Sequence, residues 1–220
     1  MSQTPALLEG LTSSAVSDAA GQIWSPQATS AAATTTMRCV VEGKAVAGPA
    51  YTIRISPRHE LDPDSRSKLF TAYAGVPAGA VVVVQVVGEV GGAVMGDVVA
   101  HTLQLAGVAG LVIDGQIRDV AALRAMGLPV WSREVTPRAI RTKEIITEVN
   151  IEVTCDGVPV RPRDYVVADD DGVFFVPQDQ AEPIFELAQR ILAEEAESHV
   201  QLAAGASILD AYKPMPTPAQ

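Results

Sequence analysis

An arginine and an aspartate stand side by side at the end of a short apolar segment. Residues 111–119 read Leu-Val-Ile-Asp-Gly-Gln-Ile-Arg-Asp, so Arg118 and Asp119 follow a stretch typical of a β-strand. An arginine can bind a carboxylate through two parallel hydrogen bonds, and a carboxylate oxygen is the kind of ligand that hard divalent cations prefer. The pair is therefore suited to hold a carboxylate-bearing substrate beside a metal ion.

A glycine-rich turn lies upstream of this pair. Residues 88–97 read Gly-Glu-Val-Gly-Gly-Ala-Val-Met-Gly-Asp and lead into the apolar, helix-like stretch 98–105. Glycines let the backbone approach a ligand closely, and the N–H groups that open a helix favour an anion. The turn has neither the spacing of a dinucleotide-binding loop nor the lysine of a nucleotide-binding one. It indicates an anion site, with Asp97 at or just before the first helical turn.

These segments belong to a predicted strand, helix and strand at 80–87, 97–106 and 111–113. A right-handed crossover would place the loops after the two strands side by side at one edge of the sheet. We therefore expect one cleft to contain the following residues: Gly91, Gly92, Asp97, Arg118 and Asp119.

The turn with Asp97 and the run Asp114-Gly115-x-x-Arg118-Asp119, 22 positions on, resemble segments of a known family. It contains the 4-hydroxy-4-methyl-2-oxoglutarate/4-carboxy-4-hydroxy-2-oxoadipate aldolases and the regulator of ribonuclease activity A. Residues 17–20, 48–52 and 162–173 also look like family segments, so the resemblance covers residues 10–195. It implies a single-domain α/β fold of the RraA-like, swivelling β/β/α type, in which a layered mixed sheet is flanked by helices.

The resemblance also implies roles for individual residues. Arg118 would bind the carboxylate and keto oxygen of a pyruvyl group, and Asp119 would be the protein ligand of Mg²⁺ or Mn²⁺. Asp97 would hydrogen-bond to water on that metal and organise proton transfer. The substrate carboxylate would be held by backbone amides at Gly92, Ala93, Val94, Met95 and Val98. One protein carboxylate suffices for Mg²⁺, which often keeps several waters.

The implied reaction is metal-dependent retro-aldol cleavage of a 4-hydroxy-2-oxo diacid, a small-molecule 2-oxo acid substrate, with release of pyruvate. Arg118 and the metal would stabilise the enolate, and Asp97 would be the base for the C4 hydroxyl or the acid for the enolate. Oxaloacetate gives the same enolate when it loses CO₂, so decarboxylation is a further expected activity. Because the family usually forms trimers or hexamers, we expect a homotrimer or hexamer.

Other functions remain open at this stage. The regulator branch of the family is noncatalytic and binds protein, but its members lack the aspartate of the pair, so Asp119 favours an enzyme. An enzyme that uses the same scaffold on another 2-oxo acid is a further alternative. Without the resemblance, Arg118 and Asp119 would suggest a surface ion pair at a helix start.

An acid from a neighbouring subunit's C-terminal region also approaches the metal in the aldolases. Glu194, Glu195 and Glu197 are positional candidates, although a solvated helix face is the simpler interpretation.

Composition narrows the class of protein. The chain has 220 residues and a formal net charge of −10, with no basic run, which argues against nucleic acid as a partner. The longest apolar run, 80–84, is far shorter than the ~20 residues of a membrane span, so we expect no membrane partner and a cytoplasmic location. Cys39 and Cys155 are predicted to be reduced thiols. We expect one domain over 1–204 and an extended or disordered Pro/Ala-containing tail over 205–220.

Two further patterns contain residue types that bind metals but lack the spacing of a metal site. The three histidines, His59, His101 and His199, lack the spacing of zinc ligands. The Asp-Asp-Asp-Gly run at 169–172 lacks the twelve-residue calcium pattern and is predicted to be a hairpin turn.

The remaining elements follow from periodicity and turn signals. A helix over 64–74 is predicted to place Leu69 and Phe70 inward, and residues 28–36 read as a loop or the lead into a strand. Ser17-Asp18 is interpreted as a helix cap. Further helices are expected at 7–20, 120–126 and 180–202, and strands at 37–41, 45–55, 129–132, 144–153, 158–160, 165–168 and 173–176.

Overall fold

The computed structural model describes residues 7–212. Within this part, eight strands form one mixed sheet in the order β1-β5-β4-β3-β2-β9-β10, with β6 paired to β2, and β7 and β8 form a separate hairpin. The strands are β1 (Arg38–Cys39), β2 (Val46–Pro57), β3 (Val81–Val86), β4 (Gly110–Ile117), β5 (Val130–Val135), β6 (Ile145–Val149), β7 (Val153–Cys155), β8 (Val158–Val160), β9 (Tyr165–Asp169) and β10 (Gly172–Val176). The α-helices are α2 (Ser13–Ile23), α3 (Pro26–Ala31), α4 (Ser65–Ala74), α5 (Asp97–Leu105), α6 (Val120–Met126), α7 (Ala181–Ala203) and α8 (Ile208–Ala211), and the short 3-10 helices are η1 (Thr142–Glu144) and η2 (Gln178–Gln180).

The centre of the sheet is parallel. β2 pairs with β3, β3 with β4 and β4 with β5 in parallel, and α5 connects β3 to β4. The predicted strand-helix-strand unit is therefore confirmed. The valine run Val81–Val84 is fully buried because its alternate side chains face two covered surfaces. Val82 and Val84 belong to the cluster with the helices, and Val81 and Val83 to the cluster with β7 and β8.

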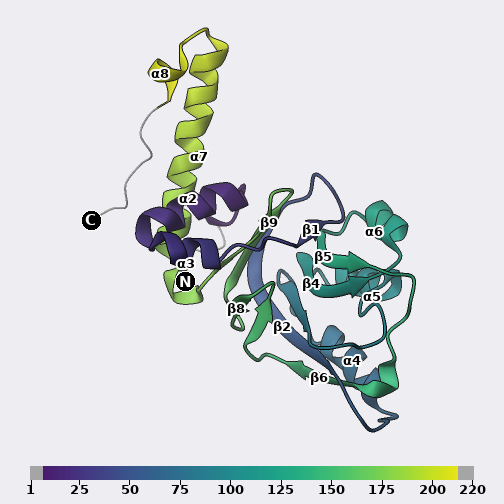
Figure 1. Ribbon diagram of the computed structural model, residues 1–220. Coiled ribbons are helices and arrows are strands. Elements are labelled where there is room, and N and C mark those ends of the chain that lie inside the picture. Colours follow the sequence, from purple (N-terminus) through teal and green to yellow (C-terminus); the bar gives the residue numbers. More distant parts are fainter. Residues whose placement is uncertain (1–6, 213–220) are drawn as a thin grey trace.

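Three layers of apolar contacts hold the molecule together. Helices α4, α5 and α6 cover one face of the parallel strands, and the β7–β8 hairpin with β9 and β10 closes over the other face. The far face of β9 and β10 packs on α2 and α7 (Figure 1). This layered mixed α/β arrangement confirms the expected fold class.

The strand that carries the Arg-Asp pair is longer than its apolar residues indicate. β4 runs to Ile117, and its register with β5 shifts between Ile113 and Gln116, which marks a bulge at the intervening polar residues. A Cβ on Gly115 would lie 2.5 Å from Cγ2 of Val86, so only glycine permits this approach. The bulge lets the strand continue past the apolar segment and deliver Arg118 beyond β3.

The N-terminal helices correct two predictions. Thr12 is the N-cap of α2 and accepts a hydrogen bond from the Ala15 N–H, whereas Ser17-Asp18 lies inside the helix and is not a cap. Part of the segment 28–36, which was predicted as a loop, belongs to α3. Ser25 caps this helix and Pro26 occupies its first turn, and these start signals outweigh the weak helix propensity of the threonine that follows.

Of the two residues of α4 that were predicted to face inward, Leu69 is buried and Phe70 is not. Leu69 is 2% exposed, but Phe70, which points about 100° away from Leu69 around the helix axis, is 43% exposed. At the other end of the chain, α7 extends away from the body and carries α8 at its tip (Figure 1). The described part of 205–220 thus contains a short helix where an extended tail was expected, and residues 213–220 lie outside the described residues. The domain boundary at 204 stays a prediction.

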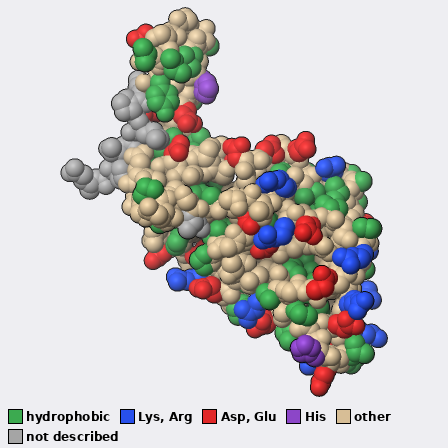
Figure 2. Space-filling model, in the orientation of Figure 1, with side chains coloured by type: hydrophobic (Ala, Val, Ile, Leu, Met, Phe, Trp, Pro, Cys, Tyr) green, Lys and Arg blue, Asp and Glu red, His purple; other side chains and the backbone are tan. Residues whose placement is uncertain are grey.

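The projecting end of α7 carries both apolar and acidic side chains. Ile208 and Leu209 on α8 are 65% and 90% exposed, and hydrophobic side chains are visible at this end in Figure 2. Glu195 and Glu197 on the same half of α7 are exposed, and Glu194 is partly exposed, which agrees with a solvated helix face within this chain. Among the described residues, no helix has both the length and the apolar character needed to cross a membrane.

The acidic run at 169–172 forms the predicted hairpin turn between β9 and β10. The Asp169 carboxylate accepts hydrogen bonds from Ser13 N and Ser13 Oγ at 2.7 and 2.6 Å, and Asp170 accepts from Gly43 N at 3.0 Å. These carboxylates therefore tie α2 and the loop before β2 to the hairpin. Cys39 and Cys155 are free thiols, as predicted.

Candidate active site

Arg118 and Asp119 form an ion pair where β4 ends, with Arg118 Nε 3.2 Å from Asp119 Oδ2. Asp119 precedes α6 with φ 61° and ψ 36°, in the left-handed region, but its side chain makes no capping hydrogen bond to that helix. The side chains are 43% and 35% exposed, so the ion pair contributes less than about 1 kcal/mol to stability. Neither capping nor stability explains this placement. The partly exposed Asp119 carboxylate is therefore available to bind a ligand beside Arg118.

Asp97 reaches the same point from α5. Its N–H donates to Asp119 Oδ2 at 3.3 Å, and its own Oδ1 accepts from Val98 N at 2.8 Å. The N-terminal turn of α5, whose N–H groups have no acceptor within the helix, therefore points at two carboxylates. Of the five residues that were expected in one cleft, Asp97, Arg118 and Asp119 therefore contact one another.

The glycine-rich segment is fixed to the neighbouring loops by backbone hydrogen bonds. Ala93 N donates to the Arg138 carbonyl at 3.0 Å, Val94 N to the Gln116 carbonyl at 2.9 Å, and Arg118 N to the Met95 carbonyl at 3.0 Å. The amides of Ala93 and Val94 are thus engaged with protein carbonyls. This bonding makes the segment a rigid wall. The amides of Asp97 and Val98 in the first turn of α5 are likewise engaged, by the carboxylates of Asp119 and Asp97.

A pocket of about 380 Å³ opens at this wall. It is lined by most of the residues that the sequence singled out: Ala93, Val94, Met95, Asp97, Val98 and Arg118. Gly92 and Asp119 are not among the lining residues. The α-carbon of Gly92 packs on the backbone of Ala139, where a Cβ would lie 2.6 Å from the carbonyl carbon. Gly91 lies instead against the side chain of Arg141.

Sequence reasoning missed part of the pocket lining. Arg66, Leu69 and Phe70 of α4 belong to it, together with Ala139, Ile140 and Thr142 after β5. The guanidinium carbon of Arg66 lies 5.2 Å from the centre of the Phe70 ring. The i, i+4 spacing of these two residues on a predicted helix was the available signal, but nothing in the sequence brings α4 next to Arg118.

A buried tyrosine supports the wall from behind. The Tyr73 hydroxyl donates to the carbonyl of Val94 at 3.1 Å, and Tyr73 is 3% exposed. Burial raises the pKa of Tyr73, so the hydroxyl remains a proton donor to this carbonyl. The side chain thus fixes the segment that carries Val94 and Met95.

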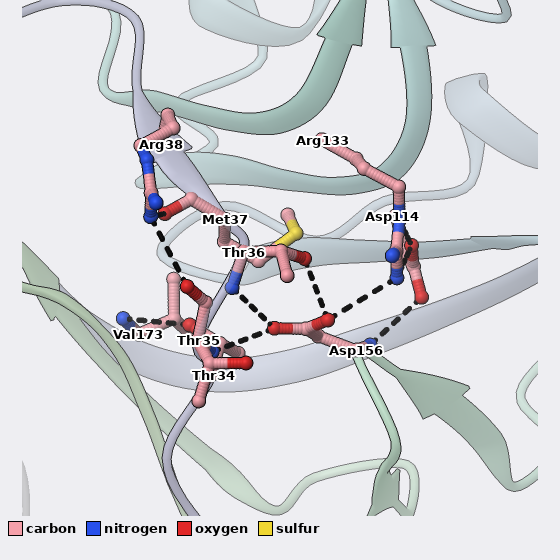
Figure 3. Close-up of polar contacts among 9 residues, drawn as sticks. All are labelled: Thr34, Thr35, Thr36, Met37, Arg38, Asp114, Arg133, Asp156 and Val173. Atoms are coloured by element: carbon pink, nitrogen blue, oxygen red, sulfur yellow. Dashed lines mark hydrogen bonds and ion pairs between the residues drawn. The ribbon is translucent and has the colours of Figure 1, made fainter.

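Asp114, the first residue of the Asp-Gly-x-x-Arg-Asp run, lies in a separate polar network (Figure 3). Its Oδ1 contacts Arg133 at 2.5 Å, and its Oδ2 accepts from Asp156 N at 2.7 Å. The Asp156 carboxylate in turn accepts from Thr35 N, Thr36 N and Thr36 Oγ1 at 2.6 to 2.8 Å. Burial alone would raise the pKa of Asp156, but these hydrogen bonds and the charge of Arg133 lower it. The network joins the segment before β1 to β4, β5 and the β7–β8 turn, and its role is structural.

The donor atoms at the site suit a cation with few protein ligands. Among residues 7–212, no group of three His, Cys, Asp or Glu side chains has a geometry that would hold a metal ion. Asp119 Oδ1 accepts no hydrogen bond from another described residue. A single free carboxylate oxygen fits a hard, largely hydrated ion such as Mg²⁺ or Mn²⁺ better than a caged metal.

Comparisons with known proteins identify the family. The sequence model of the family described as RraA-like (Aldolase/RraA) matches residues 13–175. A protein of Halalkalibacterium halodurans named "Putative 4-hydroxy-4-methyl-2-oxoglutarate aldolase" is 34% identical over 162 residues, which cover 74% of each chain.

Two solved structures extend the comparison to the fold. An uncharacterized protein from Pseudomonas syringae pv. tomato has a TM-score of 0.79 at 24% identity, covering 96% of this chain and 93% of its own. Streptomyces coelicolor RraAS2, described as an unusual member of the RNase ES inhibitor RraA protein family, has a TM-score of 0.75 at 26% identity, covering 94% of this chain and 98% of its own. The matched residues include the whole of the site described above, and the chain belongs to the RraA-like (Aldolase/RraA) family.

Proposed function

We propose that the chain is a divalent-metal-dependent lyase that cleaves 4-hydroxy-2-oxo diacids by a retro-aldol reaction and releases pyruvate. The observation that carries this proposal is the convergence of three side chains: Asp97 and Arg118 line one pocket, and Asp119 forms an ion pair with Arg118 and accepts a hydrogen bond from Asp97 N. The name of the Halalkalibacterium halodurans relative supports the reaction class.

Arg118 and the first turn of α5 account for substrate binding. The Arg118 guanidinium is 43% exposed and lines the pocket, so it can bind the carboxylate and keto oxygen of a 2-oxo acid through two N–H groups. Residues 96–99 line the same pocket, and the positive end of the helix dipole favours an anion there. The 2-oxo acid end of the substrate would therefore lie between Arg118 and α5.

Asp119 is the proposed ligand of Mg²⁺ or Mn²⁺, with water and substrate oxygens as the other ligands. When bound, such an ion supplies Lewis-acid polarisation of the 2-keto oxygen. Arg118 adds a fixed positive charge on the same oxygen as negative charge develops. No lysine is required, because the guanidinium and the ion replace a Schiff base as the electron sink.

Asp97 is the proposed proton acceptor. The C4 hydroxyl loses its proton to this carboxylate, directly or through water, and C4–O becomes a carbonyl as the C3–C4 bond breaks. The electron pair of that bond passes into the enolate of pyruvate, and a proton returned to C3 completes the product. Loss of CO₂ from oxaloacetate produces the same enolate, so we propose decarboxylation as a second activity of the site.

Pyruvate release by the full-length protein tests this function. We expect turnover of 4-hydroxy-4-methyl-2-oxoglutarate with Mg²⁺ or Mn²⁺, loss of turnover with a chelator, and loss in Asp119→Asn. Asp171→Asn is the matched control, because Asp171 is an exposed carboxylate in the β9–β10 turn. Turnover that continues undiminished with chelator and in Asp119→Asn would rule out the mechanism.

A noncatalytic regulator that binds protein is the second candidate. The structural likeness to Streptomyces coelicolor RraAS2, at 26% identity, favours it. Absence of pyruvate release from every 2-oxo acid tested, combined with binding of a ribonuclease to the wild-type chain, would decide for this function.

We also propose that the protein forms a homotrimer or a hexamer, because members of the family usually do so. Light scattering on the purified protein gives the mass in solution, and a mass near that of one 23.0 kDa chain would contradict the proposal.

A further inference from the structure

We propose that Arg66 determines specificity by binding the distal carboxylate of the substrate, so that the site selects diacids over monoacids. The inference rests on the proposed function and assigns a role to a second arginine that lines the same pocket as Arg118. Arg66 comes from α4, Arg118 from the end of β4, and both line the same pocket of about 380 Å³.

The charge of the pocket favours a ligand with two negative groups. Asp97 is the single acid among the lining residues, whereas Arg66 and Arg118 are both cations, in a chain of net charge −10. The walls between them are largely apolar, with Leu69, Met95 and Ile140 among their residues. Guanidinium groups beside apolar walls attract carboxylates more strongly than they would in open solvent.

Arg66 has no acidic partner among residues 7–212. Every ion pair found in this part of the chain involves other cations, and Lys68, two positions along α4, binds Asp62 at 2.7 Å. The hydrogen-bonding N–H groups of Arg66 are therefore not committed to a carboxylate of the chain itself. Lys68 is thus engaged with the fold, whereas Arg66 is available to bind a ligand in the pocket.

Phe70 orients Arg66 without using its donors. The guanidinium carbon lies over the ring, 5.2 Å from its centre, which is a cation–π contact. Such a contact does not use the five N–H groups of a guanidinium as hydrogen-bond donors to another side chain, so they remain available to a carboxylate. This arrangement also gives a reason for the 43% exposure of Phe70, which forms a platform at the pocket rather than part of the core.

The assignment fixes which half of the substrate each arginine holds. When the C3–C4 bond breaks, C1 to C3 remain with Arg118 as the pyruvate enolate, and the carbonyl fragment that contains C4 departs. A carboxylate attached to C4 belongs to the departing fragment, so Arg66 would hold this half and the second product would itself be a 2-oxo acid. Arg66 touches the substrate but takes no part in the bond changes.

A matched pair of substrates tests the proposal in the full-length protein with Mg²⁺. 4-Hydroxy-2-oxoglutarate and 4-hydroxy-2-oxopentanoate differ in one group, a carboxylate or a methyl on C4. We expect the wild type to prefer the diacid, and Arg66→Gln to lower kcat/KM for the diacid at least about tenfold, mainly through KM, while kcat/KM for the monoacid stays within about twofold. Lys68→Gln, an equivalent change on the same helix outside the pocket, should leave the preference intact.

The outcomes separate this inference from the proposed function. Pyruvate release from neither substrate by the wild type would refute the lyase itself. Equal turnover of both substrates by the wild type, or an equal loss for both substrates in Arg66→Gln, would refute the role of Arg66 and leave the lyase standing. Arg66 is exposed, so the melting temperature of Arg66→Gln should match that of the wild type, and this measurement excludes misfolding as the cause of a loss.

Discussion

The carboxylate of Asp119 lies directly against the α-carbon of Gly96: a Cβ at Gly96 would be 2.7 Å from Asp119 Oδ2 and 3.0 Å from Arg118 Nε. Gly96 has φ −143° and ψ −177°, an extended conformation that any residue adopts. The requirement for glycine at this position therefore comes from the ion pair and not from the backbone.

Gly96→Ala should lower activity while leaving stability nearly unchanged. The added methyl group must displace Arg118 or Asp119, and a shift of about 1 Å at a catalytic group can cost a hundredfold in rate, so we expect kcat/KM for pyruvate release to fall at least about tenfold. The melting temperature should change little. Gly21→Ala is the control, because Gly21 lies inside α2 with nothing closer than 4.0 Å to a new Cβ, and should keep full activity with equal or higher stability. Full activity in Gly96→Ala would show that the ion pair is dispensable.

Tyr73→Phe should loosen the pocket wall. The change removes the hydroxyl that donates to Val94 and leaves a buried carbonyl without its partner, at a cost of about 1 to 2 kcal/mol. We expect a melting temperature lower by a few degrees and a higher KM, measured by calorimetry and by the pyruvate assay. Tyr212→Phe is the control, since Tyr212 is 63% exposed on the projecting end of the chain. An equal effect of the two changes would contradict a specific role for the Tyr73 hydroxyl.

Asp156→Asn should destabilise the fold in a pH-dependent manner. The lowered pKa of Asp156 means that its contribution to stability is fully present above the ordinary value of 3.8 and is lost as the pH falls through the pKa of the folded state. We expect a loss of about 2 kcal/mol in the free energy of unfolding at pH 7, since the Asp156 side chain is 7% exposed and has several donors to satisfy. The difference in the free energy of unfolding between variant and wild type, measured with urea, should become smaller below pH 3.8. A difference that is constant from pH 7 to pH 3 would argue against the ionised network.

The two thiols should react slowly in the native protein. Burial raises the pKa of Cys39 to about 11, with a further contribution from the side chain of Asp170, and burial also raises the pKa of Cys155. Since the thiolate is the reactive form, Ellman's reagent at pH 8 should modify the folded protein slowly and both thiols rapidly after unfolding. Cys39 is half-buried and should react before Cys155, so Cys39→Ser should remove the faster phase. Rapid modification of both thiols in the native state would contradict the raised pKa values.

Local signals in the sequence were sufficient for several elements. Residues 120–126 form the helix that the sequence predicts, and Gly127 ends it in the left-handed conformation, because a C-terminal glycine acts through its own backbone. Residues 81–86, which are valines except for Gln85, form the central strand, because β-branched side chains favour a strand that is covered on both faces. The adjacency of Arg118 and Asp119, and the offset of 22 residues between Asp97 and Asp119 that matches the family spacing, also indicated the position of the site.

Tertiary contacts decided the rest. The left-handed conformation of Asp119, the engagement of the Ala93 and Val94 amides, and the position of Arg66 in the pocket lining depend on which loops meet. Asp114 shows what the sequence alone cannot predict. It belongs to the same short run as Arg118, but its carboxylate binds Arg133 and the Asp156 N–H. Periodicity and capping are properties of neighbours in the chain and can be read directly. The partner of a charged side chain is set by the packing of distant elements, and the sequence alone carries no local record of it.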